Sequence, residues 1–293
     1  NLFLGYLQDG AELGGEVVLK AQLSREALER VGRRLAMDAL ETALGVVQVA
    51  DAEMVRALRV ISIERGLDPR EFALVAFGGA GPMHACALAD ELGVRTVLVP
   101  RASGVLSALG LAISDVRRDY VRPFLAALDE VESGDLEEGF AAMAAAAAED
   151  LDEPDCEREA DLRYRGQSFE LTVDAADPEG LAERLHEAHE RRYGYALEDE
   201  PVEVVNLRLT ATVRRAKPEL REGEANGDAE SGRRRVNFDG DWTEAPVLDR
   251  ARMGSGSEAE GPAIVELAES TCVVRPGWGG RVDGAGTLVL ERS

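Results

Sequence analysis

The chain has 293 residues, enough for one large domain or two ordinary domains that each bury a core. Its formal net charge is −23, from 56 acidic and 33 basic residues, which argues against nucleic acid and anionic membranes as partners. No apolar run approaches the roughly 18 residues that cross a bilayer, so no membrane span is expected.

Two further features of the composition indicate where the protein works. Lys20 and Lys217 are the only lysines, and strong acidity with so little lysine favours a salt-adapted protein from a halophile. Cys86, Cys156 and Cys272 are widely spaced and odd in number. This pattern predicts neither a disulfide framework nor a zinc site, and it favours a reducing cytoplasm.

The first quarter of the chain predicts two helices. Ser24 is expected to cap the first one, and Asp51 is expected to start a second helix that ends near Gly66. The apolar stripe of the first helix consists of Leu28, Val31, Leu35, Ala39, Leu40 and Leu44. A turn at Asp68-Pro69 then leads into a strand.

Residues 72–84 are the most informative stretch of the chain. An apolar run of strand type, 72–77, meets the turn Gly78-Gly79-Ala80-Gly81, and Pro82 opens an apolar helix that ends near Gly93. Glycines at a strand-to-helix corner let the backbone come into contact with a flat or anionic ligand, where side chains would collide. The alternative is a tight turn that needs positive φ, because the spacing is neither G-x-G-x-x-G nor that of a P-loop.

The rest of the chain continues this pattern and then changes. Residues 96–99 form a second short apolar strand, and a helix rich in small residues follows. An alanine-rich helix is expected over 133–150 and another helix over 179–193, among segments that alternate with the period of a strand. A polar stretch, 216–232, reads as an exposed loop. The second part is therefore predicted to be of the α+β type.

A series of short motifs, in order and nearly end to end, resembles the hydantoinase A/5-oxoprolinase family, which includes the ATP-binding subunits of acetone and acetophenone carboxylases. The motifs are Asn1-Leu2, Leu4-Gly5, Glu64-Arg65-Gly66, Phe77 to Ala85, Leu92-Gly93, Val97 to Pro100, Gly104-Val105, Ser107 to Gly110, Arg163 to Ser168, His186 with His189 to Tyr195, Gly261 to Glu266, and Pro276-Gly277-Trp278. The chain opens on Asn1 and not on Met, inside one of these motifs, which predicts a C-terminal piece of a longer polypeptide.

The resemblance implies an α/β fold. Residues 1–125 would be the second lobe of an actin/hexokinase-type ATPase domain, and residues 126–293 a C-terminal α+β domain. In this family, ATP with a divalent metal such as Mg²⁺ phosphorylates the carbonyl oxygen of a cyclic amide before water opens the ring. A B-type subunit is the expected partner, and homo- or hetero-oligomers are expected.

Two alternative functions remain open at this stage. In the carboxylase branch of the family, the same phosphorylation acts on a ketone enol before carbon dioxide adds. Alternatively the chain is a non-catalytic subunit-assembly fragment with a vestigial half-site. No residue of this chain is predicted to be catalytic, since the phosphate-side acids of the family are expected in a part of the protein that this sequence does not contain.

The resemblance also implies a set of nucleotide-binding residues. Gly78, Gly79, Ala80 and Gly81 would pass beneath the base or ribose of a nucleotide, and Asn1 looks like the last residue of a phosphate-side segment. His84 lies on the first turn of the following helix, where the helix dipole favours a neutral ring. It either hydrogen-bonds nucleotide or substrate, or fills the interface between lobes.

Two further clusters have both a functional and a structural interpretation. His186 and His189 lie three residues apart on one helix, a spacing that suits a metal, but no third ligand is evident and no metal site is predicted. Arg163 and Arg165 flank a turn at Gly166, where a guanidinium can bind an anion; pairing with the many acidic residues is the alternative.

Overall fold

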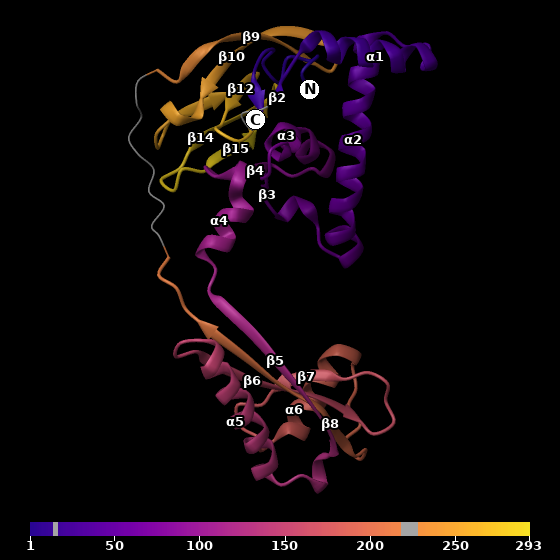
Figure 1. Ribbon diagram of the computed structural model, residues 1–293. Coiled ribbons are helices and arrows are strands. Elements are labelled where there is room, and N and C mark those ends of the chain that lie inside the picture. The colour runs from indigo at the N-terminus through magenta and orange to yellow at the C-terminus, as the bar shows by residue number, and fades with distance from the viewer. Residues whose placement is uncertain (14–16, 218–227) are drawn as a thin grey trace. The chain divides into compact units, whose positions relative to one another are not determined.

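The computed structural model describes residues 1–13, 17–217 and 228–293. They form two compact units: unit 1 consists of Asn1–Ala112 and Pro218–Ser293, and unit 2 of Ile113–Lys217. The chain therefore leaves unit 1, completes unit 2, and returns to unit 1 (Figure 1).

Unit 1 begins with two helices, α1 (Ala21–Leu35) and α2 (Ala39–Ile61). They are separated at Ala36, which adopts a left-handed conformation with φ 55°, and α2 is opened by Asp38 and Glu41 in a capping box. The predicted helix starts are wrong: Ser24 lies inside α1, and Asp51 lies in the middle of α2.

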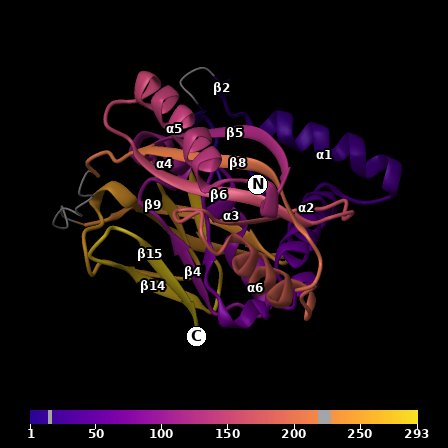
Figure 2. The ribbon, with the colours of Figure 1, turned by 90° about the horizontal axis from the view of Figure 1, so that it is seen from below.

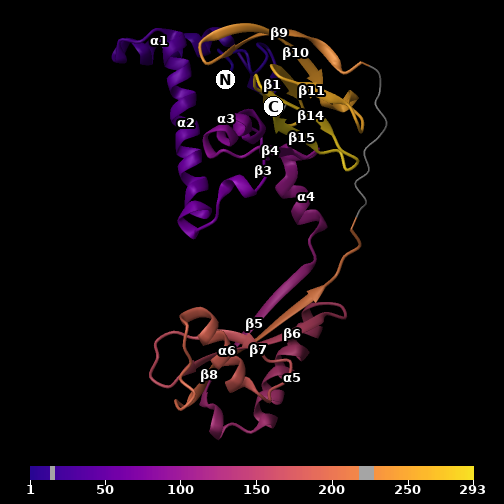
Figure 3. The same cartoon turned by 180° about the vertical axis from the view of Figure 1, so that it is seen from behind.

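The segment around the glycine turn is close to its prediction. A short strand, β3 (Leu74–Val75), is followed by α3 (Gly81–Leu92), and Gly93 caps the helix with φ 70°. Pro82 is the second residue of α3, not the first. Helix α2 runs beside α3, as Figure 3 shows, and α4 (Leu106–Ile113) ends at the boundary of unit 1.

Two sheets complete unit 1. One has the strand order β11-β14-β15-β4-β3, in which only β3 and β4 are parallel, and the other has the order β13-β12-β10-β9, in which only β10 and β12 are parallel. Their remaining bounds are β4 Thr96–Val99, β9 Glu230–Phe238, β10 Asp241–Asp249, β11 Glu258–Glu260, β12 Ala263–Glu266, β13 Thr271–Val274, β14 Trp278–Val282 and β15 Leu288–Arg292. A separate pair joins β1 (Glu12–Leu13) and β2 (Val17–Val18).

The last two strands of the chain, β14 and β15, belong to the same sheet as β3, the strand that leads into the glycine turn. Leu290 of β15 lies opposite Val97 of β4, which lies opposite Leu74 of β3 on its other side. The predicted division into 1–125 and 126–293 differs from these compact units, because residues after 227 pair with strands near residue 97. As a division into family domains it stays a prediction.

Unit 2 is an antiparallel sheet with two helices packed on it. The strand order is β5-β8-β6-β7, and α5 lies along β5 and β8 (Figure 2). The elements are β5 Val116–Ala127, α5 Ser133–Asp150, β6 Asp155–Tyr164, β7 Leu171–Asp174, α6 Leu181–Tyr193 and β8 Val202–Val213. These bounds confirm the two helices predicted from the sequence and the strand alternation between them.

Most of the predicted polar loop, 216–232, lies outside the described residues. In its described part the prediction is partly wrong, because residues 230–232 begin β9 and pair with β10. Short 3-10 helices connect other elements, at Ile63–Arg65, Pro69–Glu71, Ser103–Val105, Leu128–Glu130 and Arg250–Arg252. Over the stretches with described coordinates, no helix is both long and apolar enough to cross a membrane.

Each unit buries its own apolar core. In unit 2, both helices and the sheet share one cluster that includes Phe140, Leu162 and Leu185. The described residues of unit 1 form two clusters. One lies between α3 and the strands around Trp278, and the other joins the N-terminal segment to α2, the start of α3 and the sheet β13-β12-β10-β9.

Candidate functional site

The glycine turn between β3 and α3 is fixed by backbone hydrogen bonds to the next segment of the chain. The N–H of Ala76 donates to the carbonyl of Leu98 at 2.8 Å, and the N–H of Gly78 donates to the carbonyl of Ser103 at 2.7 Å. Gly78 has φ +83°, a conformation that side chains other than glycine rarely adopt. The expected positive φ is therefore confirmed at Gly78.

The fold does not require a positive φ at Gly79. It is exposed, its φ is not positive, and a Cβ there would come no closer than 3.8 Å to another residue, the carbonyl oxygen of Glu269. Gly81 also has ordinary φ, with a nearest contact of 3.7 Å to Ala76, and Ala80 beside it is exposed. The turn thus has an exposed backbone surface at Gly79-Ala80 that no side chain of the described residues covers closely.

The turn between β12 and β13 packs against this corner from the C-terminal part of the chain. A Cβ at Gly104 would lie 2.3 Å from the Cβ of Glu269, so only glycine fits there. The Ser103 hydroxyl lies 3.0 Å from that of Ser270, and both side chains are buried. No local sequence pattern indicated this support, because it joins residues 167 positions apart.

His84 is buried and paired. Its Nδ1 lies 2.7 Å from Oδ1 of Asp51 on α2, and the two side chains are only 10% and 15% exposed. The structure thereby brings together α2 and the first turn of α3. Asp51 was missed as a site residue because it was expected to start a helix; the available signal was a carboxylate on the helix face of the apolar residues Val47 and Val55.

Asn1 lies in a segment that packs close to the start of α3. Its carbonyl accepts a hydrogen bond from the N–H of Tyr6 at 3.1 Å, and Leu4 and Tyr6 share a core cluster with Met83. Within the residues that the structure describes, no hydrogen bond joins Asn1 itself to the glycine turn. Its nucleotide-side role stays a prediction.

The two histidines of α6 are engaged in structural contacts. Nδ1 of His186 lies 2.7 Å from the hydroxyl of Tyr164, which also accepts the N–H of Leu197 at 3.1 Å. His189 is 1% exposed and donates from Nδ1 to the carbonyl of Tyr195 at 2.7 Å. In the described ranges, no group of three or more His, Cys, Asp or Glu side chains is arranged to hold a metal ion.

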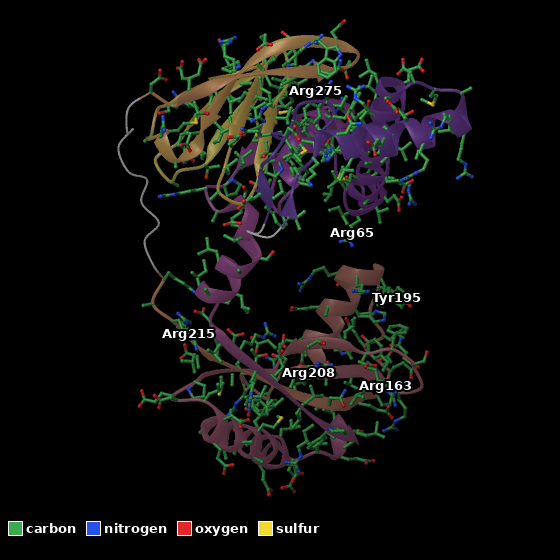
Figure 4. All side chains as sticks on the ribbon, turned by 45° about the horizontal axis from the view of Figure 1, so that its top comes forward. Arg65, Arg163, Tyr195, Arg208, Arg215 and Arg275 are labelled. Carbon is green, nitrogen blue, oxygen red and sulfur yellow. The ribbon has the colours of Figure 1, made fainter. Side chains whose placement is uncertain are left out.

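The arginine cluster of unit 2 is paired with an acid. Arg163 and Arg165 both contact Glu203, at 2.9 and 3.5 Å, and Gly166 makes the turn with φ 86°. Figure 4 shows Arg163 on the sheet and Tyr195 beyond the end of α6. The structural alternative is therefore confirmed for these arginines.

The fold defines this chain as a mixed α/β protein, in which a glycine-rich turn connects a strand to a helix. The family model described as hydantoinase/oxoprolinase matches residues 1–120, and the model of the hydantoinase/oxoprolinase C-terminal domain matches residues 135–292. The chain belongs to the hydantoinase/oxoprolinase family.

Several relatives are similar over most of the chain. It is 35% identical over its whole length to an uncharacterized protein of Methanocaldococcus jannaschii, and 32% identical over 99% of its length to caprolactamase subunit alpha of Pseudomonas jessenii. It is 29% identical over 87% of its length to 5-oxoprolinase 1 of Arabidopsis thaliana. The chain spans 44%, 45% and 21% of these relatives, less than half of each.

Two solved structures share its fold. A nucleotide-free acetone carboxylase, described for ATP-dependent acetone carboxylation, matches 99% of the chain and 45% of its own, with a TM-score of 0.80 at 26% identity. The ATP-dependent caprolactamase from Pseudomonas jessenii matches 100% of the chain and 46% of its own, with a TM-score of 0.71 at 31% identity. These likenesses confirm the predicted fold class.

Proposed function

We propose that this chain is the nucleotide-contacting part of an ATP-dependent cyclic-amide hydrolase of the hydantoinase or 5-oxoprolinase A type. The observation that carries the proposal is Gly79, which is exposed, has ordinary φ and has room for a Cβ. Unlike other exposed glycines with room for a Cβ, such as Gly134, it lies at a strand-to-helix corner, where bare backbone allows the close approach of a ligand.

The residues of the corner have separate tasks in this proposal. Gly78 turns the chain with its positive φ, and Gly79, Ala80 and Gly81 offer bare backbone to the base or ribose. Helix α3, which has no side chain capping its N-terminus, presents the N–H of Gly81 and the positive end of its dipole to an oxygen of the ligand, since Pro82 has no N–H and that of Met83 donates to the Ala80 carbonyl. MgATP, when bound, supplies the phosphoryl group that activates the carbonyl oxygen of the substrate.

A cyclic amide is the preferred substrate class. The caprolactamase and 5-oxoprolinase relatives are named for lactam substrates, and the identity of 32% to caprolactamase subunit alpha exceeds the 26% to the acetone carboxylase beta subunit. Caprolactamase and acetone carboxylase are named by subunits, which supports a partner subunit of the B type for this protein as well. The second candidate function is the ketone carboxylase branch, favoured by the TM-score of 0.80.

The test follows ADP release by the intact natural protein with its partner subunit. We expect release to rise on addition of 5-oxoproline, a hydantoin or caprolactam, and not with acetone and bicarbonate. Stimulation by acetone and bicarbonate alone would assign the protein to the carboxylase branch. Absence of nucleotide binding would leave the non-catalytic assembly role.

A variant of the corner tests the nucleotide contact directly. Gly79→Arg places a long side chain on the exposed backbone surface, and we expect ATP binding to be lost while the fold is retained. Gly134→Arg on α5 is the matched control, because its Cβ meets nothing within 4 Å and its φ, like that of Gly79, is ordinary. Unchanged ATP affinity in the Gly79 variant contradicts the assignment of the corner.

A further inference from the structure

We propose that Asp51 is a positioning residue of this site: through Nδ1 of His84 it holds the ring so that Nε2 faces the bound nucleotide. The inference rests on the proposed function, because the ligand at the corner is the nucleotide proposed there. It adds to the site a residue that neither the glycine motif nor the helix α3 contains.

The first step is the direction of the hydrogen bond. An ionised carboxylate only accepts, so at 2.7 Å from Asp51 Oδ1 the Nδ1 of His84 carries the proton and donates it. In the neutral ring, Nε2 is then the nitrogen with the free lone pair. The contact thereby selects one tautomer of a ring on the first turn of α3.

The second step concerns Nε2 itself. No described residue forms a hydrogen bond with it, and it is not among the fully buried side-chain atoms that lack a partner. It therefore retains access to solvent although the His84 side chain is only 10% exposed. A nearly buried ring with one nitrogen engaged and the other open is arranged to meet a group from outside the chain.

The third step is the location of Asp51 between the two parts of the predicted site. Burial raises the pKa of the Tyr6 hydroxyl; Arg275 opposes this shift, and Asp239 and Asp51 add to it. Met83, the neighbour of His84, shares a core cluster with Tyr6 of the segment whose first residue is Asn1, and Asp51 bonds directly to the helix that follows the glycine turn. Arg275, labelled in Figure 4, belongs to the same unit.

A purely structural role would not need this pair. Helices α2 and α3 already pack through apolar side chains, and a buried polar pair stabilises a fold no better than apolar residues of similar size. What the pair adds is a fixed ring orientation. At metal sites, mutating a group that hydrogen-bonds the second nitrogen of a ligating histidine typically costs about 10–100-fold in metal affinity or activity.

The test compares four variants of the intact natural protein by calorimetric titration with adenylyl imidodiphosphate and Mg²⁺. Asp51→Ala releases the ring, and His84→Asn retains an amide that can donate to Asp51 but removes Nε2. Glu53→Gln is the matched control, because Glu53 lies on the same helix and, among the described residues, pairs with the exposed Arg56 alone. Asp51→Asn tests rescue by an uncharged acceptor.

We expect Asp51→Ala and His84→Asn to weaken binding by about tenfold or more, Asp51→Asn by less, and Glu53→Gln by no more than about twofold. Nitrogen NMR of His84 should show Nδ1–H in the natural protein and a mixed tautomer in Asp51→Ala. Natural affinity in a folded Asp51→Ala or in His84→Asn overturns the positioning role. If the natural protein does not bind the probe, the proposed function itself fails, and this inference fails with it.

Discussion

Asp161 on strand β6 is an acidic residue with no exposed surface. Three hydrogen-bond donors surround its buried carboxylate. Thr172, Asn206 and Arg208 donate to its carboxylate at 2.7 to 2.8 Å. Burial alone raises the pKa of Asp161, but these hydrogen bonds outweigh it and hold the pKa below the ordinary 3.8. The folded state of unit 2 therefore favours the ionised acid.

This network predicts an acid-dependent loss of stability. Asp161→Asn should lower the free energy of unfolding at pH 7 by about 2–3 kcal/mol, since it leaves buried donors poorly paired. Because the folded pKa lies below the unfolded one, the contribution of Asp161 is present above pH 3.8 and is lost as the pH falls through the folded value. Urea unfolding at pH 7 and pH 3 measures both effects.

The control is Asp155→Asn on the same strand. The side chains of Asp155 and its partner Arg214 are 68% and 80% exposed, so this change should cost no more than about 0.5 kcal/mol. An equal cost for the two substitutions contradicts the interpretation of the Asp161 network.

The three cysteines should differ in reactivity. Burial raises the pKa of the Cys86 thiol to about 12 and that of Cys272 well above its ordinary value, whereas Cys156 is exposed. Since the thiolate is the reactive form, one thiol should react rapidly with a disulfide reagent at pH 8, and two only after unfolding. Cys156→Ser should abolish the rapid phase; a rapid phase that persists would show that the core is open.

At the residue scale, the sequence correctly indicated positions whose backbone needs a positive φ. It did not indicate side-chain contacts between distant residues. Gly78 was expected at a turn and Gly93 near a helix end, and both have positive φ. The pair of Asp51 with His84 joins residues 33 positions apart, and no local pattern encodes such a contact. The nucleotide role of the predicted residues stays a prediction.

At the scale of elements, the junction between α1 and α2 shows why helix boundaries were misplaced. Ala36 ends α1 in the left-handed conformation, where glycine or asparagine would have been a recognisable stop signal. Alanine instead favours continued helix, so the apolar stripe was read across the break. Ser24 and Asp51 are common capping residues, but here they lie within helices.

Two substitutions test these helix starts. Asp38→Ala removes the acceptor for the N–H of Glu41, at 2.8 Å, and should lower the stability of unit 1 by about 1 kcal/mol. Ser24→Ala should leave stability within about 0.5 kcal/mol, because Ser24 caps nothing. Thermal unfolding of both variants measures the difference, and a larger cost at Ser24 than at Asp38 would contradict the observed boundaries.

At the scale of the whole molecule, sequence order and spatial order differ. The sequence correctly predicted the alanine-rich helix 133–150 and the helix 179–193, which the structure starts at Leu181, because local sequence determines them. It gave no hint that β14 and β15 return to the sheet of β4, since strand pairing over such separation depends on the whole fold. The halophilic and cytoplasmic character inferred from charge and cysteine content stays a prediction.

The return of the chain predicts which segments fold alone. Residues 113–217 contain all four strands of their sheet and both helices of their core. A fragment of these residues alone should therefore unfold cooperatively. Residues 1–125 lack β14 and β15, and would expose Val97 and Val99, which are fully buried in unit 1. Circular dichroism melting and amide chemical-shift dispersion of the two chains measure the contrast. A cooperative 1–125 beside an unfolded 113–217 would show that the unit boundaries do not describe independent stability.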